Sequence, residues 1–380
     1  MNLSAHSLFF NLEGPVLASE HPMRRPKAGP YVHSRSLPTG DWHLFAALAN
    51  NHFMDFGSEG ATQTIHILRQ QGATWAGYGA NLTDARQANF FTIQGMRVAW
   101  ISSCETQFGT ATSTQPGFPP VGAWVYEAIR QAKSESDAVI LSIHGANEMS
   151  PWPSVKWVEL LRSFVDAGVS VVHGSHSHVP QGFEIYNKGL ILYGLGNFAV
   201  NPSFWRSHPN TLWSLAASVD LQDVQTFEII PVSLDEAENV SRIVVEKMNI
   251  AALSSINQYL IDINEPLQDP ALLESLSQEV ALHFFSEYGA AFMGWHQGEV
   301  RDIKDLARFA KRVGRRVVDW TGRRSTSSEE TTNRLLLRYH MVACESHRFM
   351  LETALGILSG EIPDVRTARS HELAQRYLHA

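Results

Sequence analysis

The stretch VSVVHGSHSHVP, from Val169 to Pro180, ends an apolar strand in three closely spaced histidines. The β-branched residues before Gly174 predict a short buried strand, which the glycine ends. In extended backbone, His176 and His178 leave the chain on the same side because they are two residues apart. Two adjacent imidazoles can share one metal ion or serve two neighbouring ions. A polar surface loop is the alternative, and this stretch alone does not decide between them.

The composition is that of an ordinary globular protein. Of the 380 residues, 44% are hydrophobic and 18% are charged, which is ample material for a core. The net charge of -8 argues against a nucleic acid as the main partner.

The sequence also bears on the compartment. Only two cysteines occur, far apart, so we expect no disulfide framework and a reducing environment. The N-terminal segment lacks the basic region of a signal peptide, and no apolar stretch approaches the roughly 20 residues of a membrane span. We therefore expect a soluble cytoplasmic protein without a transmembrane segment.

The predicted secondary structure changes near residue 235. Before it, segments typical of strands and helices alternate, and the part from Asp137 to Gly174 is a strand–helix–strand unit. Such a unit predicts parallel strands with a right-handed crossover, and mixed sheets covered by helices form a layered α/β sandwich. We therefore predict an α/β domain over residues 1–235. Residues 236–380 carry apolar side chains at helical spacing and predict a mostly helical extension.

Three other predicted strands are also followed by polar residues that can bind metals. Glu13 comes after LFFN, Asn51 and His52 come after FAAL, and His144 comes after VILSI. Loops at the carboxyl ends of parallel strands meet in one crevice, so these groups can approach the histidine pair. Together they offer oxygen and nitrogen ligands, which suit Mn, Fe or Zn better than Ca or Mg.

These residues resemble the CapA-type proteins of poly-γ-glutamate capsule synthesis, a branch of the calcineurin-like metallophosphoesterases. The resemblance covers roughly residues 5–235, and several separated blocks follow the family's order. The blocks are FFNLEGPV, ALANNHFMDFGSEG, GYGANLTDAR, IHGANE, VVHGSHSHVPQGFEIY and LILYGLGNF. The resemblance implies a four-layer metallophosphoesterase sandwich, with two mixed sheets flanked by helices. The helical C-terminal extension lies outside it.

The resemblance also implies roles for the residues after the strands. His52 matches the histidine that faces the scissile phosphate, so it would protonate the leaving oxygen. The cofactor would be one or two divalent ions of Mn, Fe or Zn, which acidify a bound water and neutralise phosphoryl oxygens. The implied metal ligands are Glu13, in the place of a bridging carboxylate, Asn51, His144, His176 and His178.

Four further polar residues are candidates for contacts with the substrate or with the ligands. Asp55 is expected to orient His52 rather than to bind metal. Glu148, at the end of IHGANE, can touch the substrate or accept a hydrogen bond from a ligand. Asn50 belongs to the NNH motif, and Asn197 can contact the site or simply form a turn.

One motif of the family is missing. The family opens with a strand ending in GD, some tens of residues before NLE, whereas this sequence has only twelve residues before Glu13. Asp41 and His43 resemble a ligand pair, but they come just before the NNH strand and are rejected on chain order. The first metal position then keeps four ligands and the second keeps two. The former are Glu13, Asn51, His144 and His176, and the latter are Glu13 and His178.

The sequence thus predicts a CapA-like metal-dependent hydrolase of a phosphoester or polymer intermediate, linked to the synthesis of a capsule or surface polymer. The alternative is a degenerate, non-catalytic member that binds a polymer or a partner in capsule assembly. The substrate is a small molecule or a polymer. The C-terminal helices, with a basic stretch over residues 301–324, are either solvated or a surface for a capsule-synthesis protein.

Overall fold

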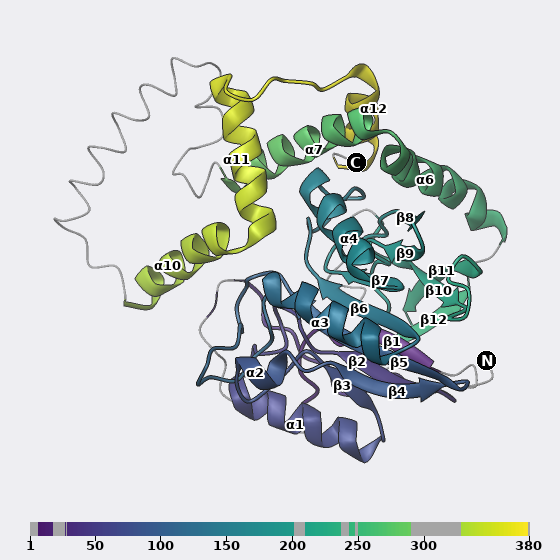
Figure 1. Cartoon of the computed structure of the whole chain (residues 1–380). Helices are drawn as coiled ribbons and strands as arrows, with labels where there is room; N and C mark the ends of the chain where they lie inside the picture. Colours follow the sequence, from purple (N-terminus) through teal and green to yellow (C-terminus); the bar gives the residue numbers. More distant parts are fainter. Residues whose placement is uncertain are drawn as a thin grey trace.

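The computed structural model describes residues 7–17, 27, 29–200, 210–236, 243–247, 250–289 and 328–378 (Figure 1). Strands and helices alternate in the first part of the chain, and helices make up the C-terminal part. This confirms the predicted α/β class with a helical C-terminal part. The basic stretch at residues 301–324 lies outside the described residues.

A six-stranded mixed sheet forms the centre of the first part. Its inner strands run parallel, and the helices α3 (Ala123–Glu135) and α4 (Val155–Ala167) make the crossovers between them. The outer strands β4 and β8 pair antiparallel with β5 and β9. In sheet order the strands are β4 (Asn89–Ile93), β5 (Met96–Cys104), β6 (Ala138–His144), β7 (Val171–Ser175), β9 (Gly189–Leu192) and β8 (Phe183–Tyr186).

Two three-stranded sheets accompany the large one. The first is parallel, with helix α1 (Gly57–Gln70) between its second and third strands and the short helix α2 (Leu82–Ala85) after it. Its strands are β1 (Ser7–Asn11), β2 (His43–Ala47) and β3 (Thr74–Ala76). The second sheet is antiparallel and contains β10 (Trp213–Val219), β11 (Phe227–Glu236) and β12 (Ile243–Lys247). Strand β12 was not predicted. It lies beyond residue 235, and the domain division at that residue stays a prediction.

The apolar side chains lie in three layers of core that define a four-layer sandwich. Between the sheets, Phe45 of β2 stacks on Phe9 with ring centroids 4.3 Å apart and meets Trp100 of β5 edge-on at 5.7 Å. Helices α3 and α4 cover the other face of the large sheet, with Ile129 and Leu161 fully buried. Helix α1 covers the outer face of β1 and β2. The predicted order of helix, sheet, sheet and helix is thereby confirmed.

The C-terminal helices pack together and onto the sandwich (Figure 1). Trp152, in the loop between β6 and α4, is 1% exposed within their core, and its indole N–H donates to the carbonyl of Asp262 at 3.0 Å. None of the described helices is long and apolar enough to span a membrane. The helical elements are α6 (Ile250–Gln268), α7 (Pro270–Phe284), the π-helix η1 (Phe285–Gly289), α10 (Ser328–Ala343), α11 (Glu345–Ser359) and α12 (Ala368–Tyr377).

Gly174 permits the close approach of β7 to the chain that follows β9. A Cβ at this position would overlap the carbonyl oxygen of Tyr193. We expect Gly174→Ala to lower the free energy of unfolding by about 1–3 kcal/mol, the usual cost of overpacking. Urea unfolding followed by circular dichroism measures it. Gly122→Ala is the control, since its nearest neighbour would lie 3.7 Å away. Equal midpoints for the two variants would contradict the prediction.

Candidate metal centre

The register of the large sheet brings the carboxyl ends of three strands to one level. His144, the last residue of β6, pairs with Cys104 of β5 on one side and with Ser175 of β7 on the other. The first small sheet presents the carboxyl ends of β1 and β2, followed by Glu13 and Asn51, to the same region. The residues predicted at separate strand ends therefore meet at one edge of the sandwich.

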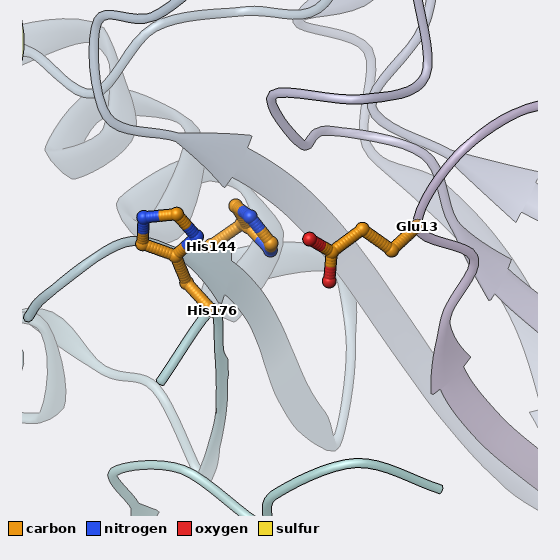
Figure 2. Close-up of side chains that lie close together, drawn as sticks. All are labelled: Glu13, His144 and His176. Atoms are coloured by element: carbon orange, nitrogen blue, oxygen red, sulfur yellow. The ribbon is translucent and has the colours of Figure 1, made fainter. Parts of the chain in front are cut away.

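Glu13, His144 and His176 form the centre of this cluster. Their potential ligand atoms all lie within 4.8 Å of one another. Figure 2 shows the carboxylate of Glu13 pointing toward the two imidazoles from the opposite side. Asn51 joins them, because its side-chain oxygen Oδ1 lies 3.0 Å from His144 Nε2.

Two of the histidines are held through Nδ1. The Nδ1 atom of His144 lies 3.0 Å from Ser175 Oγ, and that of His178 lies 3.0 Å from Asn197 Oδ1. The amide oxygen of Asn197 can only accept, so this contact favours the tautomer of His178 with a proton on Nδ1 and a lone pair at Nε2. Asn197 therefore acts on a histidine of the cluster, and Ser175, which sequence reasoning missed, can do the same for His144.

The donor set fits a divalent ion of Mn, Fe or Zn. Burial lowers the pKa of His144 well below its usual range, and His176 and His178 lower it further. Burial also lowers the pKa of His176, so both imidazoles are neutral and able to ligate. When His144 carries its proton on Nδ1, Nε2 and Asn51 Oδ1 are two acceptors 3.0 Å apart. Ligand atoms at right angles around one ion, with bonds of about 2.1 Å, would lie about this far apart, whereas those of a tetrahedral zinc ion would lie about 3.4 Å apart.

Glu148 offers a second carboxylate to the cluster. One of its oxygens lies 3.4 Å from His176 Nε2, and Glu148, His176 and His178 form a second group of potential ligands. Partial burial raises the pKa of Glu148, but His176 and His178 outweigh this effect and lower the pKa to about 2. The sequence indicated a substrate contact or hydrogen-bond acceptor here. The structure adds a carboxylate placed to ligate.

His52 lies beside this cluster and is oriented by Asp55. Its Nδ1 lies 2.8 Å from a carboxylate oxygen of Asp55, and its Nε2 lies 3.9 Å from Glu13. The buried amine of Lys27 forms an ion pair with Asp55 and lies 2.9 Å from His52 Nδ1. Burial lowers the pKa of Lys27, although Asp55 opposes the shift. Lys27 was not predicted, because nothing in its sequence surroundings links it to NNH.

Asn50 joins the loops that carry Glu13 and Asn51. Its amide oxygen accepts from the backbone N–H groups of His52 and Phe53 at 3.2 and 2.8 Å. Its amide nitrogen donates to the side chain of Asn11 and to the carbonyl of Leu12. Since all these partners are protein groups and Asn50 is fully buried, it supports the site rather than facing a substrate.

The extended-chain argument for the histidine pair is wrong. Strand β7 ends at Ser175, and His176 and His178 adopt positive φ angles of 106° and 59°. Their ring centroids lie 6.2 Å apart because the loop folds back, not because side chains alternate along a strand. His43 lies at the amino end of β2, where its Nε2 contacts Thr74 Oγ1, at the opposite end of the strand from Asn51.

A sequence profile described as "Bacterial capsule synthesis protein PGA_cap" matches residues 3–202, more than half of the 380 residues. The chain belongs to this family. The "Capsule biosynthesis protein CapA" of Bacillus anthracis is 29% identical over 198 residues, 50% of this chain and 47% of that protein. The "PGA biosynthesis protein CapA" of Bacillus subtilis is 28% identical over 194 residues, 50% of each. The resemblance indicated by the motifs is thereby confirmed.

The shared part is limited in extent. The chain spans about half the length of these curated relatives. Among solved structures, a 5'-nucleotidase from Candida albicans aligns with a TM-score of 0.34 and 13% identity, over 60% of this chain and 44% of that one. The family profile ends before α6, so the C-terminal helices lie outside the matched residues.

Ser175 offers a test of the metal centre that leaves the proposed ligands in place. Ser175→Ala removes the partner of His144 Nδ1, and we expect the affinity for Mn²⁺ or Zn²⁺ to fall about 10- to 100-fold. Equilibrium dialysis with each metal measures it. Ser142→Ala is the control, because the Ser142 hydroxyl contacts His173 and Trp100 instead. Unchanged affinity in Ser175→Ala would remove this serine from the centre.

The three histidines of the opening stretch are expected to differ. His176→Ala and His178→Ala should each lower the metal content of the purified chain, because their imidazoles lie in the cluster. His173→Ala should keep its metal, because His173 contacts Ser142 within the sheet. Elemental analysis decides the matter. Metal loss in the His173 variant, with normal content in the other two, would reverse the assignment.

Proposed function

We propose that the chain is a metal-dependent hydrolase that cleaves a phosphoester or an intermediate of a surface polymer. The observation that carries this proposal is the convergence of neutral imidazoles, a carboxylate and an amide oxygen beside a further, independently oriented histidine. A histidine cluster that only stabilises the fold does not need an additional oriented histidine beside it. Metal-dependent hydrolysis, in contrast, needs a proton donor next to the metal centre.

Under this proposal, two sets of residues hold the ions. A bound divalent ion supplies an acidified water and neutralises charge on phosphoryl oxygens. The first position is held by Glu13, Asn51, His144 and His176. Glu148 and His178 hold a second position, because Glu148, His176 and His178 form a second group of potential ligands. Glu13 can reach this position too, because it lies 3.7 Å from His178 Nε2.

His52 is the proposed acid. Asp55 fixes the ring through Nδ1, which leaves Nε2 directed at the carboxylate of Glu13 and at the space between the ligands. From there, Nε2–H can donate its proton to the oxygen of the leaving group. The ion pair with Lys27 holds the Asp55 carboxylate in position.

The biological setting follows from the family. Its description names bacterial capsule synthesis, and the curated relatives are named for capsule and PGA biosynthesis. We place the hydrolase in the synthesis of a capsule or another surface polymer. Its location in the cytoplasm and a capsule-synthesis partner on the C-terminal helices stay predictions.

Substitution of His52 separates catalysis from metal binding. We expect His52→Asn to retain its metal but to hydrolyse bis(p-nitrophenyl) phosphate about 10²–10⁴-fold more slowly, the usual contribution of a general acid. Metal content and turnover are measured on the same Mn²⁺-loaded sample. His43→Asn, at the far end of β2, is the control. A wild-type chain that binds metal tightly without hydrolysing phosphodiesters would instead support the non-catalytic, binding role.

The second metal position is tested through Glu148. Glu148→Gln removes the charge but keeps the size of the side chain, so we expect the stoichiometry to fall from two ions per chain toward one. The proposed first position keeps all of its ligands in this variant. Calorimetric titration with Mn²⁺ counts the sites. A wild-type chain with a single site that is unaffected by Glu148→Gln would show that Glu148 is no ligand.

A further inference from the structure

The loop after β5 connects the metal centre to the C-terminal helices. Glu105 accepts hydrogen bonds from the Ser346 hydroxyl at 2.6 Å and from the Cys344 thiol at 3.5 Å. The backbone N–H and the hydroxyl of Thr106 both donate to the carboxylate of Glu345, at 2.7 and 2.8 Å. These bonds fix the first turn of α11 against the sandwich.

Of the next two residues of the loop, Gln107 contacts the metal centre and Phe108 contacts the C-terminal helices. The side-chain nitrogen of Gln107 lies 3.3 Å from His176 Nε2, within the metal centre. The ring of Phe108 stacks on His340 of α10, with centroids 4.8 Å apart and an interplanar angle of 21°. Helices α10 and α11 are therefore held next to the metal centre by one continuous loop.

From Phe108, a row of rings continues toward the surface. The centroids of His340 and His347 lie 4.7 Å apart, those of His347 and Phe284 lie 5.2 Å apart, and those of Phe284 and Tyr288 lie 5.4 Å apart. Tyr288 is 58% exposed, whereas Phe108 is buried. We name these residues the aromatic row: Phe108, His340, His347, Phe284 and Tyr288.

The aromatic row carries no charge but has unused hydrogen-bonding atoms. Burial lowers the pKa of His340 to about 3 and that of His347 to about 4, so both rings are neutral near pH 7. The Nδ1 atoms of both rings are buried and have no hydrogen-bond partner among the residues that the structure describes. The charge of Glu148 raises the pKa of both histidines, against the larger effect of burial, and also raises that of Tyr288.

We propose that the aromatic row is a substrate-binding wall that takes a planar, uncharged group attached to the phosphoester, with His340 and His347 as residues that determine specificity. This inference rests on the proposed hydrolase function. Ring faces favour a stacked planar group. A second anionic group fits poorly, since the row offers it no cation and Glu148 would repel it.

Two phosphonates that differ only in a ring provide the test. Phenylphosphonate and methylphosphonate share the head group, but only the former can reach the aromatic row. We expect the Mn²⁺-loaded full chain to bind phenylphosphonate about 2- to 12-fold more tightly, the usual range for one aromatic contact. The double variant His340→Gln, His347→Gln should lose this preference while its Kd for methylphosphonate stays unchanged. Isothermal titration calorimetry measures all four constants.

Two further variants guard against a folding defect. Tyr288→Ser changes an exposed ring and should reduce the preference for phenylphosphonate without affecting the fold. Arg348→Gln, at an exposed position next to His347, should keep it. Equal binding of the two phosphonates by the wild type, or a preference untouched by both the histidine and Tyr288 variants, overturns the proposal. A preference for phenylphosphonate without hydrolysis of bis(p-nitrophenyl) phosphate would support the substrate-binding wall and contradict the proposed hydrolase. Hydrolysis without that preference would support the hydrolase and contradict the wall.

Discussion

The in-register parallel alignment of β5, β6 and β7 is the constraint on which the site depends. It sets Cys104, His144 and Ser175 side by side, so the loops that begin after them leave the sheet at one level. A slip of one residue would turn His144 to the other face of the sheet and away from Asn51. The fully buried strand β6, with apolar neighbours on both faces, makes such a slip costly.

Much of this arrangement was predictable because apolar strand segments followed by polar residues can be recognised in the sequence. Apolar strands followed by polar residues indicated Glu13, Asn51, His144 and the histidine pair, and the structure brings these side chains together. The predicted α/β class with flanking helices and a helical C-terminal part also matches the structure, but only one of its sheets is mixed and strand β12 was not predicted. What the sequence conveys is which residues end strands, and the parallel topology turns that into proximity.

The supporting contacts were not predictable from the sequence. Ser175 reaches His144 only because two strands pair in one register, and Lys27 pairs with Asp55 from a distant part of the sequence. Gln107 contacts His176 through a loop without any recognisable motif. The change in predicted secondary structure near residue 235 likewise did not indicate that Trp152 packs among the C-terminal helices. Such packing depends on three-dimensional shape rather than on a local sequence pattern.

The positive φ angles at His176 and His178 lower the stability of the fold, but they bring both imidazoles into the cluster. A residue with a Cβ in this conformation costs on the order of 1–3 kcal/mol, a strain that glycine would avoid. Glycine, however, has no imidazole to offer. The surrounding sandwich must therefore be stable enough to hold two histidines in a backbone shape that they disfavour. Glycine would relieve the strain at either position, but it would remove one imidazole from the cluster.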